Sequence, residues 1–61
     1  MATELQPGDP VRLLGPAAGM AEGAMGRLLG WYRNDEEPEV LVNFWDGGPL
    51  RVPAHLVVLD D

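Results

Sequence analysis

Glycine and proline interrupt this chain so often that they leave no room for a regular helix. Eight glycines and six prolines are scattered over 61 residues. The longest proline-free stretch, residues 17–37, contains four glycines, at positions 19, 23, 26 and 30. Each of them costs about 1 kcal/mol in a helix interior relative to alanine. Short strands separated by turns fit this pattern, so we expect an all-β fold.

The first half of the chain predicts two strands on either side of a long loop. A turn at residues 7–9 precedes a short strand in which apolar residues recur at every second position. Residues 15–23 are too loose for a strand and suit a surface loop of the length that can carry function. We expect the second strand at residues 25–33, where Gly26 and Gly30 predict a bulge or a sharp bend.

Residues 39–45 form the clearest predicted strand in the chain. Period-two alternation places Val40, Val42 and Phe44 on the face toward the core. The opposite face carries Leu41, Asn43 and Trp45. Trp45 is therefore expected to point away from the core.

Turn residues divide the rest of the second half. Residues 34–38 are a polar turn, and residues 46–48 predict a tight hairpin because the Asp-Gly pair suits positive φ angles. A short fourth strand follows around residues 50–52. Residues 53–55 suit a single helical turn, and residues 56–59 suit a fifth strand.

Three short motifs resemble those of small SH3-like barrels. Residues 7–14, PGDPVRLL, are similar to the "PGD-x-V" opening of many bacterial SH3-like and KOW-type domains. Residues 22–28 look like the "G-x-x-G-x-V" step that follows, and residues 53–57 resemble the "P-S-N-Y-V" end of eukaryotic SH3 domains. The resemblance implies a five-stranded SH3-like barrel over residues 7–61, with a long loop after strand 1 and a single helical turn before the last strand. Residues 1–6 would be a flexible tail, and closure of the barrel would remove exposed sheet edges.

The layout is also similar to that of two kinds of small photosynthetic protein. One is the small barrel-shaped peripheral component of photosystem I, and the other is the ferredoxin-docking component of the photosynthetic NAD(P)H dehydrogenase-like complex. Both bind larger redox complexes and carry no cofactor, so the resemblance implies an accessory role on a larger assembly. The chain departs from KOW domains in lacking a basic surface. It departs from peptide-binding SH3 domains in lacking the "A-L-Y-D-Y" opening and in having Leu56 for the closing tyrosine.

The chain carries ten acidic residues against four basic ones, a formal net charge of −6. All four bases are arginines: Arg12, Arg27, Arg33 and Arg51. An acidic surface disfavours nucleic acid, whose phosphates need clustered positive charge, and favours a basic partner or simply solubility. One continuous stripe of the four arginines beside Trp45 or Trp31 would instead favour nucleic acid.

Nothing in the chain predicts a membrane or secretory protein. No apolar run approaches the roughly 20 residues of a membrane-spanning helix, so we expect no membrane insertion. The first five residues lack the basic and apolar pattern of a signal peptide. There is no cysteine, so no disulfide supports the fold, and we expect a cytoplasmic protein.

The side chains needed for catalysis are few. The chain has no cysteine, serine or lysine, and Thr3 in the predicted tail is its only aliphatic hydroxyl. His55 is the sole base of the usual kind, and no nucleophile lies beside it in the sequence. Acid–base catalysis by carboxylates needs a concave pocket, which a chain this small can hardly enclose. We therefore expect no enzyme activity, no cofactor and no metal site.

Asp35, Glu36 and Glu37, followed by Glu39, form the densest acidic cluster. Their spacing matches no EF-hand loop, which disfavours a calcium site. The cluster is either a solvated hairpin tip or an electrostatic docking point for a basic surface.

Three aromatic residues are candidate partner anchors: Trp31, Tyr32 and Trp45. Tryptophan and tyrosine are enriched at the centres of protein interfaces. Because the first two are adjacent, one of them points outward in a regular strand. Leu14, Leu29 and Leu41 also fall on outer faces and would form an apolar patch with Trp45 if they cluster. The alternative is that a tryptophan covers the rim of the core beneath an arginine, with a cation–π contact.

These features favour a small adaptor or accessory subunit that docks on a larger protein. The apolar face would supply affinity, and the acidic turn would steer association. One alternative is a KOW-like module that contacts nucleic acid or the ribosome. Another is a small inhibitor of phage or toxin–antitoxin type, which the sequence does not separate from an adaptor. The predicted partner-binding residues are Leu29, Trp31, Tyr32, Asp35, Glu36, Glu37, Leu41 and Trp45.

Overall fold

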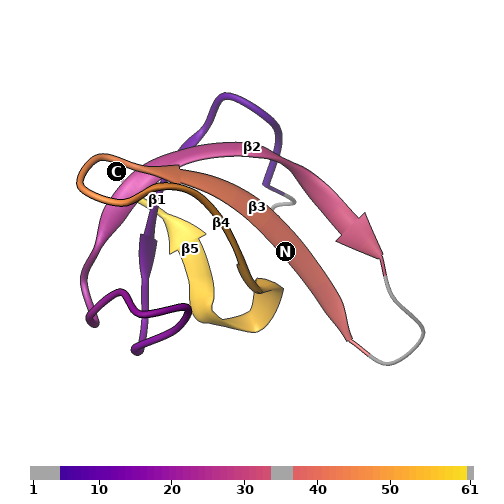
Figure 1. Ribbon diagram of the computed structural model, residues 1–61. Helices are drawn as coiled ribbons and strands as arrows, with labels where there is room; N and C mark the ends of the chain where they lie inside the picture. Colours follow the sequence, from indigo (N-terminus) through magenta and orange to yellow (C-terminus); the bar gives the residue numbers. More distant parts are fainter. Residues whose placement is uncertain (1–4, 34–36, 61) are drawn as a thin grey trace.

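Five antiparallel strands form one sheet in the computed structural model, which describes residues 5–33 and 37–60 (Figure 1). Along the chain the elements are β1 (Pro10–Leu13), β2 (Met25–Arg33), β3 (Pro38–Phe44), β4 (Gly48–Pro53), the 3-10 turn η1 (Ala54–Leu56) and β5 (Val57–Leu59). The strands lie in the order β4-β3-β2-β1-β5. The prediction of an all-β fold with five strands and a helical turn before the last is confirmed.

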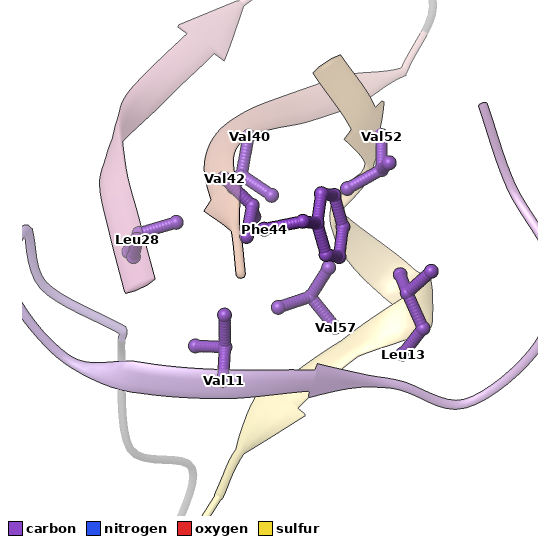
Figure 2. Close-up of a cluster of buried hydrophobic side chains, with 8 residues drawn as sticks. All are labelled: Val11, Leu13, Leu28, Val40, Val42, Phe44, Val52 and Val57. Atoms are coloured by element: carbon purple, nitrogen blue, oxygen red, sulfur yellow. The ribbon is translucent and has the colours of Figure 1, made fainter. Parts of the chain in front are cut away.

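The hydrophobic core lies on one side of this sheet, and every strand contributes to it (Figure 2). Its buried side chains are Val11, Leu13, Leu28, Val40, Val42, Phe44, Val52 and Val57. Figure 2 shows them pointing toward one another, with the Phe44 ring among the aliphatic groups. The core face predicted for β3 is therefore confirmed. We call the opposite side of the sheet the outer face.

Gly26 is a point of close approach between β2 and β3. It is buried, and a Cβ atom built on it would lie 2.5 Å from the carbonyl oxygen of Asn43 and 2.8 Å from the Cα of Phe44. Real Cβ atoms do not come this close to a backbone. The residue is therefore glycine because the neighbouring strand occupies the space of a side chain.

A β-bulge at Leu29 confirms the irregularity predicted for β2. Leu28 pairs with Val42, but the next pair is Gly30 with Leu41, so Leu29 is an extra residue on the β2 side. One extra residue shifts the two-residue alternation by one position. From Gly30 onward, each side chain of β2 therefore lies on the face opposite to the one that regular alternation would give it.

The hairpin between β3 and β4 differs from the prediction in the position of its left-handed residue. The N–H of Gly47 donates to the carbonyl oxygen of Phe44 at 3.3 Å, and the positive φ, 74°, occurs at Gly48. We expected positive φ within the Asp-Gly pair at residues 46 and 47, which was wrong. A three-residue loop places its left-handed residue after the turn, where it rejoins the ladder opposite Phe44.

The long loop at residues 15–23 covers one end of the core. Ala17 and Met20 form an isolated β-bridge, and both are partly buried against the core. A Cβ atom built on Gly47 would lie 2.8 Å from the sulfur of Met20, so the loop reaches the β3–β4 hairpin. Part of the predicted surface loop is thus a structural cover.

The first described residues also contact the rest of the fold. Leu5 is partly buried against the core. Gln6 and Asp9 exchange two hydrogen bonds, one to the Asp9 carboxylate at 2.9 Å and one to the Gln6 carbonyl at 3.1 Å. The tail predicted for residues 1–6 lies mostly outside the described residues, and its boundary stays a prediction.

Strands β4 and β5 remain edges of the sheet. No ladder joins them within residues 5–33 and 37–60, so the expectation that closure removes the edges was wrong for the backbone hydrogen bonds. Composition and length protect the edges instead. Pro49 and Pro53 in β4 have no N–H to offer another strand, and β5 is only three residues long.

Replacement of Gly26 by alanine tests the close approach of β2 and β3. We expect Gly26→Ala to lower the free energy of unfolding by about 1–3 kcal/mol, because the new methyl group overlaps backbone atoms of β3. Urea denaturation followed by circular dichroism measures this change.

Gly30→Ala is the matched control on the same strand. A Cβ atom on Gly30 has nothing within 4 Å, and its φ is not positive. We expect it to change the free energy of unfolding by less than about 0.5 kcal/mol. Equal destabilisation by the two variants would show that the strand tolerates no side chain at either glycine and would contradict the steric explanation.

Candidate functional site

The outer face of the β2–β3 ladder collects most of the predicted binding residues that the structure describes. Successive cross-strand positions hold Met25 with Trp45, Arg27 with Asn43, Leu29 and Gly30 with Leu41, and Tyr32 with Glu39. We call this set of residues the β2–β3 outer face. Along it, an apolar pair, a polar pair and a second apolar pair follow one another.

Trp45 and Met25 form the first apolar pair. The backbone N–H of Trp45 donates to the carbonyl oxygen of Met25 at 3.1 Å, which continues the ladder by one position past Phe44. The two side chains are 56% and 45% exposed. Trp45 thus lies outside the core, as the alternation of β3 predicted. Met25 was not among the predicted binding residues, because only the register places it beside Trp45.

Leu29 and Leu41 form the second apolar pair. Leu29 is exposed, Leu41 is partly buried, and the space above Gly30 beside them is open. The polar pair of Arg27 and Asn43 separates them from Trp45.

Leu14 takes no part in either apolar pair. It lies beyond the end of β1, where its N–H donates to the carbonyl oxygen of Leu56 at 2.7 Å. The sequence predicted one apolar patch of Leu14, Leu29, Leu41 and Trp45 only if they cluster, and the strand ladders pair Leu14 with none of the other three. Alternation places Leu29, Leu41 and Trp45 on one face, but the strand register keeps the two leucines apart from the tryptophan along the ladder.

Tyr32 closes the other end of the β2–β3 outer face. The guanidinium carbon of Arg51 lies 4.7 Å from the centre of the Tyr32 ring. The Nε atom of Arg51 also lies 3.9 Å from a carboxylate oxygen of Glu39. The alternative left open by the sequence placed a cation–π contact on a tryptophan, but among the described residues it forms on Tyr32, because the bulge turns this ring outward. At an exposed site such a contact contributes about 0.5–1 kcal/mol.

Trp31 lies on the core side of the sheet. Its cross-strand partner is the fully buried Val40, and directly opposed residues share a face. The indole N–H donates to the carbonyl oxygen of Leu5 at 3.0 Å, and the side chain is 41% exposed. Trp31 therefore lies on the core side of the β2–β3 ladder and is not part of the β2–β3 outer face.

The structure describes one of the three predicted acidic residues of the turn. Glu37 is exposed and directly precedes β3, whose first residue pairs with the last residue of β2. Asp35 and Glu36 lie outside the described residues. Glu37 is thus at the Tyr32 end of the ladder.

Three arginines project from the outer face of the sheet. Arg12 lies opposite Met25, and its Nε atom is 3.7 Å from a carboxylate oxygen of Asp60. Arg51 has the Glu39 contact described above. Arg27 is exposed and, within the described part of the chain, makes no ion pair. The stripe of four arginines that would favour nucleic acid is therefore interrupted by carboxylates, and the side chain of Arg33 is not described.

Candidate metal-ligating side chains are dispersed over the described residues. Across residues 5–33 and 37–60, no three His, Asp or Glu side chains come together in a way that would hold a metal ion. His55 is exposed in η1. No helix in this part of the chain has the length and apolar character needed to cross a membrane.

Comparison with known proteins gives no family for this chain. No protein-family model, no curated protein and no solved structure matches it. The residues of the outer face and their arrangement are therefore the basis for a functional proposal.

Replacing each tryptophan by phenylalanine separates a structural from a surface role. We expect Trp31→Phe to lower the free energy of unfolding by about 1 kcal/mol, because it removes the indole donor to Leu5. Trp45→Phe should change it by less than about 0.5 kcal/mol, since Trp45 is exposed in a turn. Urea unfolding followed by far-ultraviolet circular dichroism gives both values. A larger loss of unfolding free energy for Trp45→Phe than for Trp31→Phe would show that Trp45 belongs to the core, and would contradict its assignment to the β2–β3 outer face.

Proposed function

We propose that this protein is a small non-catalytic adaptor or accessory subunit that docks on a larger protein through its β2–β3 outer face. The observation that carries the proposal is the pairing of apolar side chains there, the exposed Met25 with Trp45 and the exposed Leu29 with the partly buried Leu41. The whole core lies on the other side of the same strands, so these side chains contribute nothing to it. Large apolar groups that are paired on a surface favour a partner that covers them.

The fold that we propose for this role is the SH3-like barrel. Strand β1 lies between β2 and β5, the helical turn precedes the last strand, and all five strands enclose one core. These features support the barrel layout implied by the sequence motifs. In such a layout the outer face is free for a partner because the fold does not use it.

Charge supports association with a partner that has a basic rim. The chain has a net charge of −6, and Glu37, the described member of the acidic cluster, directly precedes β3 at the Tyr32 end of the outer face. Opposite charges raise the rate at which two proteins meet and orient the encounter. In this proposal the apolar pairs supply affinity and the acidic turn supplies steering.

A KOW-like nucleic-acid module is the second candidate. The observation in its favour is that Arg12, Arg27 and Arg51 share the outer face with Trp45 and Tyr32. Phosphate binding needs several uncompensated cations, and each one neutralises one phosphate. Two of the three arginines have a carboxylate within 4 Å, and the whole chain repels a polyanion, so we favour the protein partner. An inhibitor of phage or toxin–antitoxin type would use the same surface as an adaptor.

Affinity purification from the native host with matched variants tests the adaptor function. The wild-type chain should capture a discrete protein, and Trp45→Ala or Leu29→Ala should reduce capture by about tenfold or more, as for central interface residues. Leu14→Ala is the control, because Leu14 is as exposed as Leu29 but is not part of the β2–β3 outer face. Equal capture by all variants, or recovery of ribosomal RNA in place of a protein, would contradict the proposal.

A further inference from the structure

Acidic and basic residues are separated in this fold. The three described arginine side chains, at positions 12, 27 and 51, all lie in strands on the outer face. Only one carboxylate, that of Glu39, lies in a strand beside them. The other described acids are in turns or at chain ends: Asp9, Glu22, Glu37, Asp46 and Asp60. The outer face is therefore locally basic in a chain of net charge −6.

Arg27 lies at the centre of this basic face. Its cross-strand neighbours are Pro10 on β1 and Asn43 on β3, and neither is acidic. Two residues away along β2 lie Met25 and Leu29, the β2 members of the two apolar pairs. An exposed guanidinium without a carboxylate beside it keeps its planar set of N–H donors available for a ligand.

Arg12 is the arginine next to Arg27 in the strand register, and it has Asp60 as its ion-pair partner. It lies directly opposite Met25 and is therefore a diagonal neighbour of Arg27 across β1 and β2. On the other side, the Asn43 side chain offers amide donors opposite Arg27. A carboxylate placed over Arg27 thus meets the charged guanidinium and, opposite it, a neutral amide donor.

We propose that the β2–β3 outer face binds an extended peptide segment in which an acidic residue lies two positions from an apolar residue on either side, and that Arg27 pairs with the acidic side chain. The inference rests on the proposed function and names the chemistry of the partner. Side chains two residues apart on a strand are separated by about 7 Å, and an extended peptide repeats at the same spacing. A peptide with the order apolar, x, acidic, x, apolar therefore matches this surface. Its two apolar side chains would contact the Met25–Trp45 and Leu29–Leu41 pairs, and its acidic side chain would lie over Arg27 and Asn43.

The same observations disfavour single-stranded nucleic acid as the occupant. A strand of nucleotides brings a phosphate with every base, while the described part of the face has one arginine without a carboxylate near it. A peptide with one carboxylate needs only that arginine. Its apolar side chains cover the two apolar pairs, which phosphates would leave exposed.

Selection from a random-peptide library displayed on phage tests this inference with the full chain as bait. We expect the enriched peptides to share Asp or Glu two positions from an apolar residue on both sides. The synthetic consensus peptide is then titrated against the protein by NMR, with its acidic residue replaced by the corresponding amide in a second peptide. The amide peptide should bind about tenfold more weakly, as expected for loss of a charge-assisted hydrogen bond.

Arg27→Gln and Arg12→Gln form the matched pair of protein variants. Both residues are exposed on the outer face, but Arg12 already has Asp60 beside it. We expect Arg27→Gln to lose about tenfold in affinity for the acidic peptide and to bind the acidic and amide peptides equally. Arg12→Gln should keep the preference for the acidic peptide. Unchanged circular dichroism of both variants shows that the fold is intact.

Three outcomes with selected peptides would overturn the inference. They are a consensus without an acidic residue, binding that Arg27→Gln leaves unchanged, and tighter binding of an oligothymidine than of any selected peptide. A consensus that lacks acid but loses binding in Trp45→Ala would leave the adaptor function standing. Failure to enrich any peptide would also reject the extended segment, while capture of a folded protein would still support the adaptor.

Discussion

The bulge at Leu29 is the constraint on which the rest of the surface depends. Strand β2 must place Leu28 in the core beside Val42, and one extra residue then reverses the alternation for the remainder of the strand. Trp31 consequently faces inward, where its indole holds the segment before β1 through the carbonyl of Leu5. Tyr32 faces outward and meets Arg51. In a regular strand without the bulge, Trp31 would face outward and Tyr32 would face the core.

The small size of the chain explains how the remaining residues are used. A domain of this length buries only about 60% of its unfolded surface, so its core has little reserve. The core draws on all five strands, and the long loop adds Ala17 and Met20 to its edge. Buried space is so scarce that Gly26 has no room for a methyl group. The exposed apolar pairs on the outer face are therefore costly for folding, which favours a functional reason for their presence.

The distribution of charge extends the same division between the two sides of the sheet. Arginines lie in the strands, where their long stems cover the outer face, whereas nearly all described carboxylates lie in turns and ends. The turns give the protein its overall acidic character, and the strands give the outer face a basic centre. A partner therefore meets the negative charge of the turns and the positive charge of the outer-face arginines. The net charge acts on a partner that comes within about 8–10 Å, the screening length at physiological ionic strength, and the arginines act on a partner that is in contact with them.

The sequence by itself determined the all-β fold, the positions of the five strands and the core residues of β3. These follow from local rules, since glycine and proline exclude helix and alternation marks Val40, Val42 and Phe44. Only the tertiary structure decided which aromatic residues face outward, which leucines pair and where Arg27 lies among them. The reason is that alternation defines a side of a strand but not its register. A bulge of one residue reverses the side, and the neighbouring strand chooses the partner.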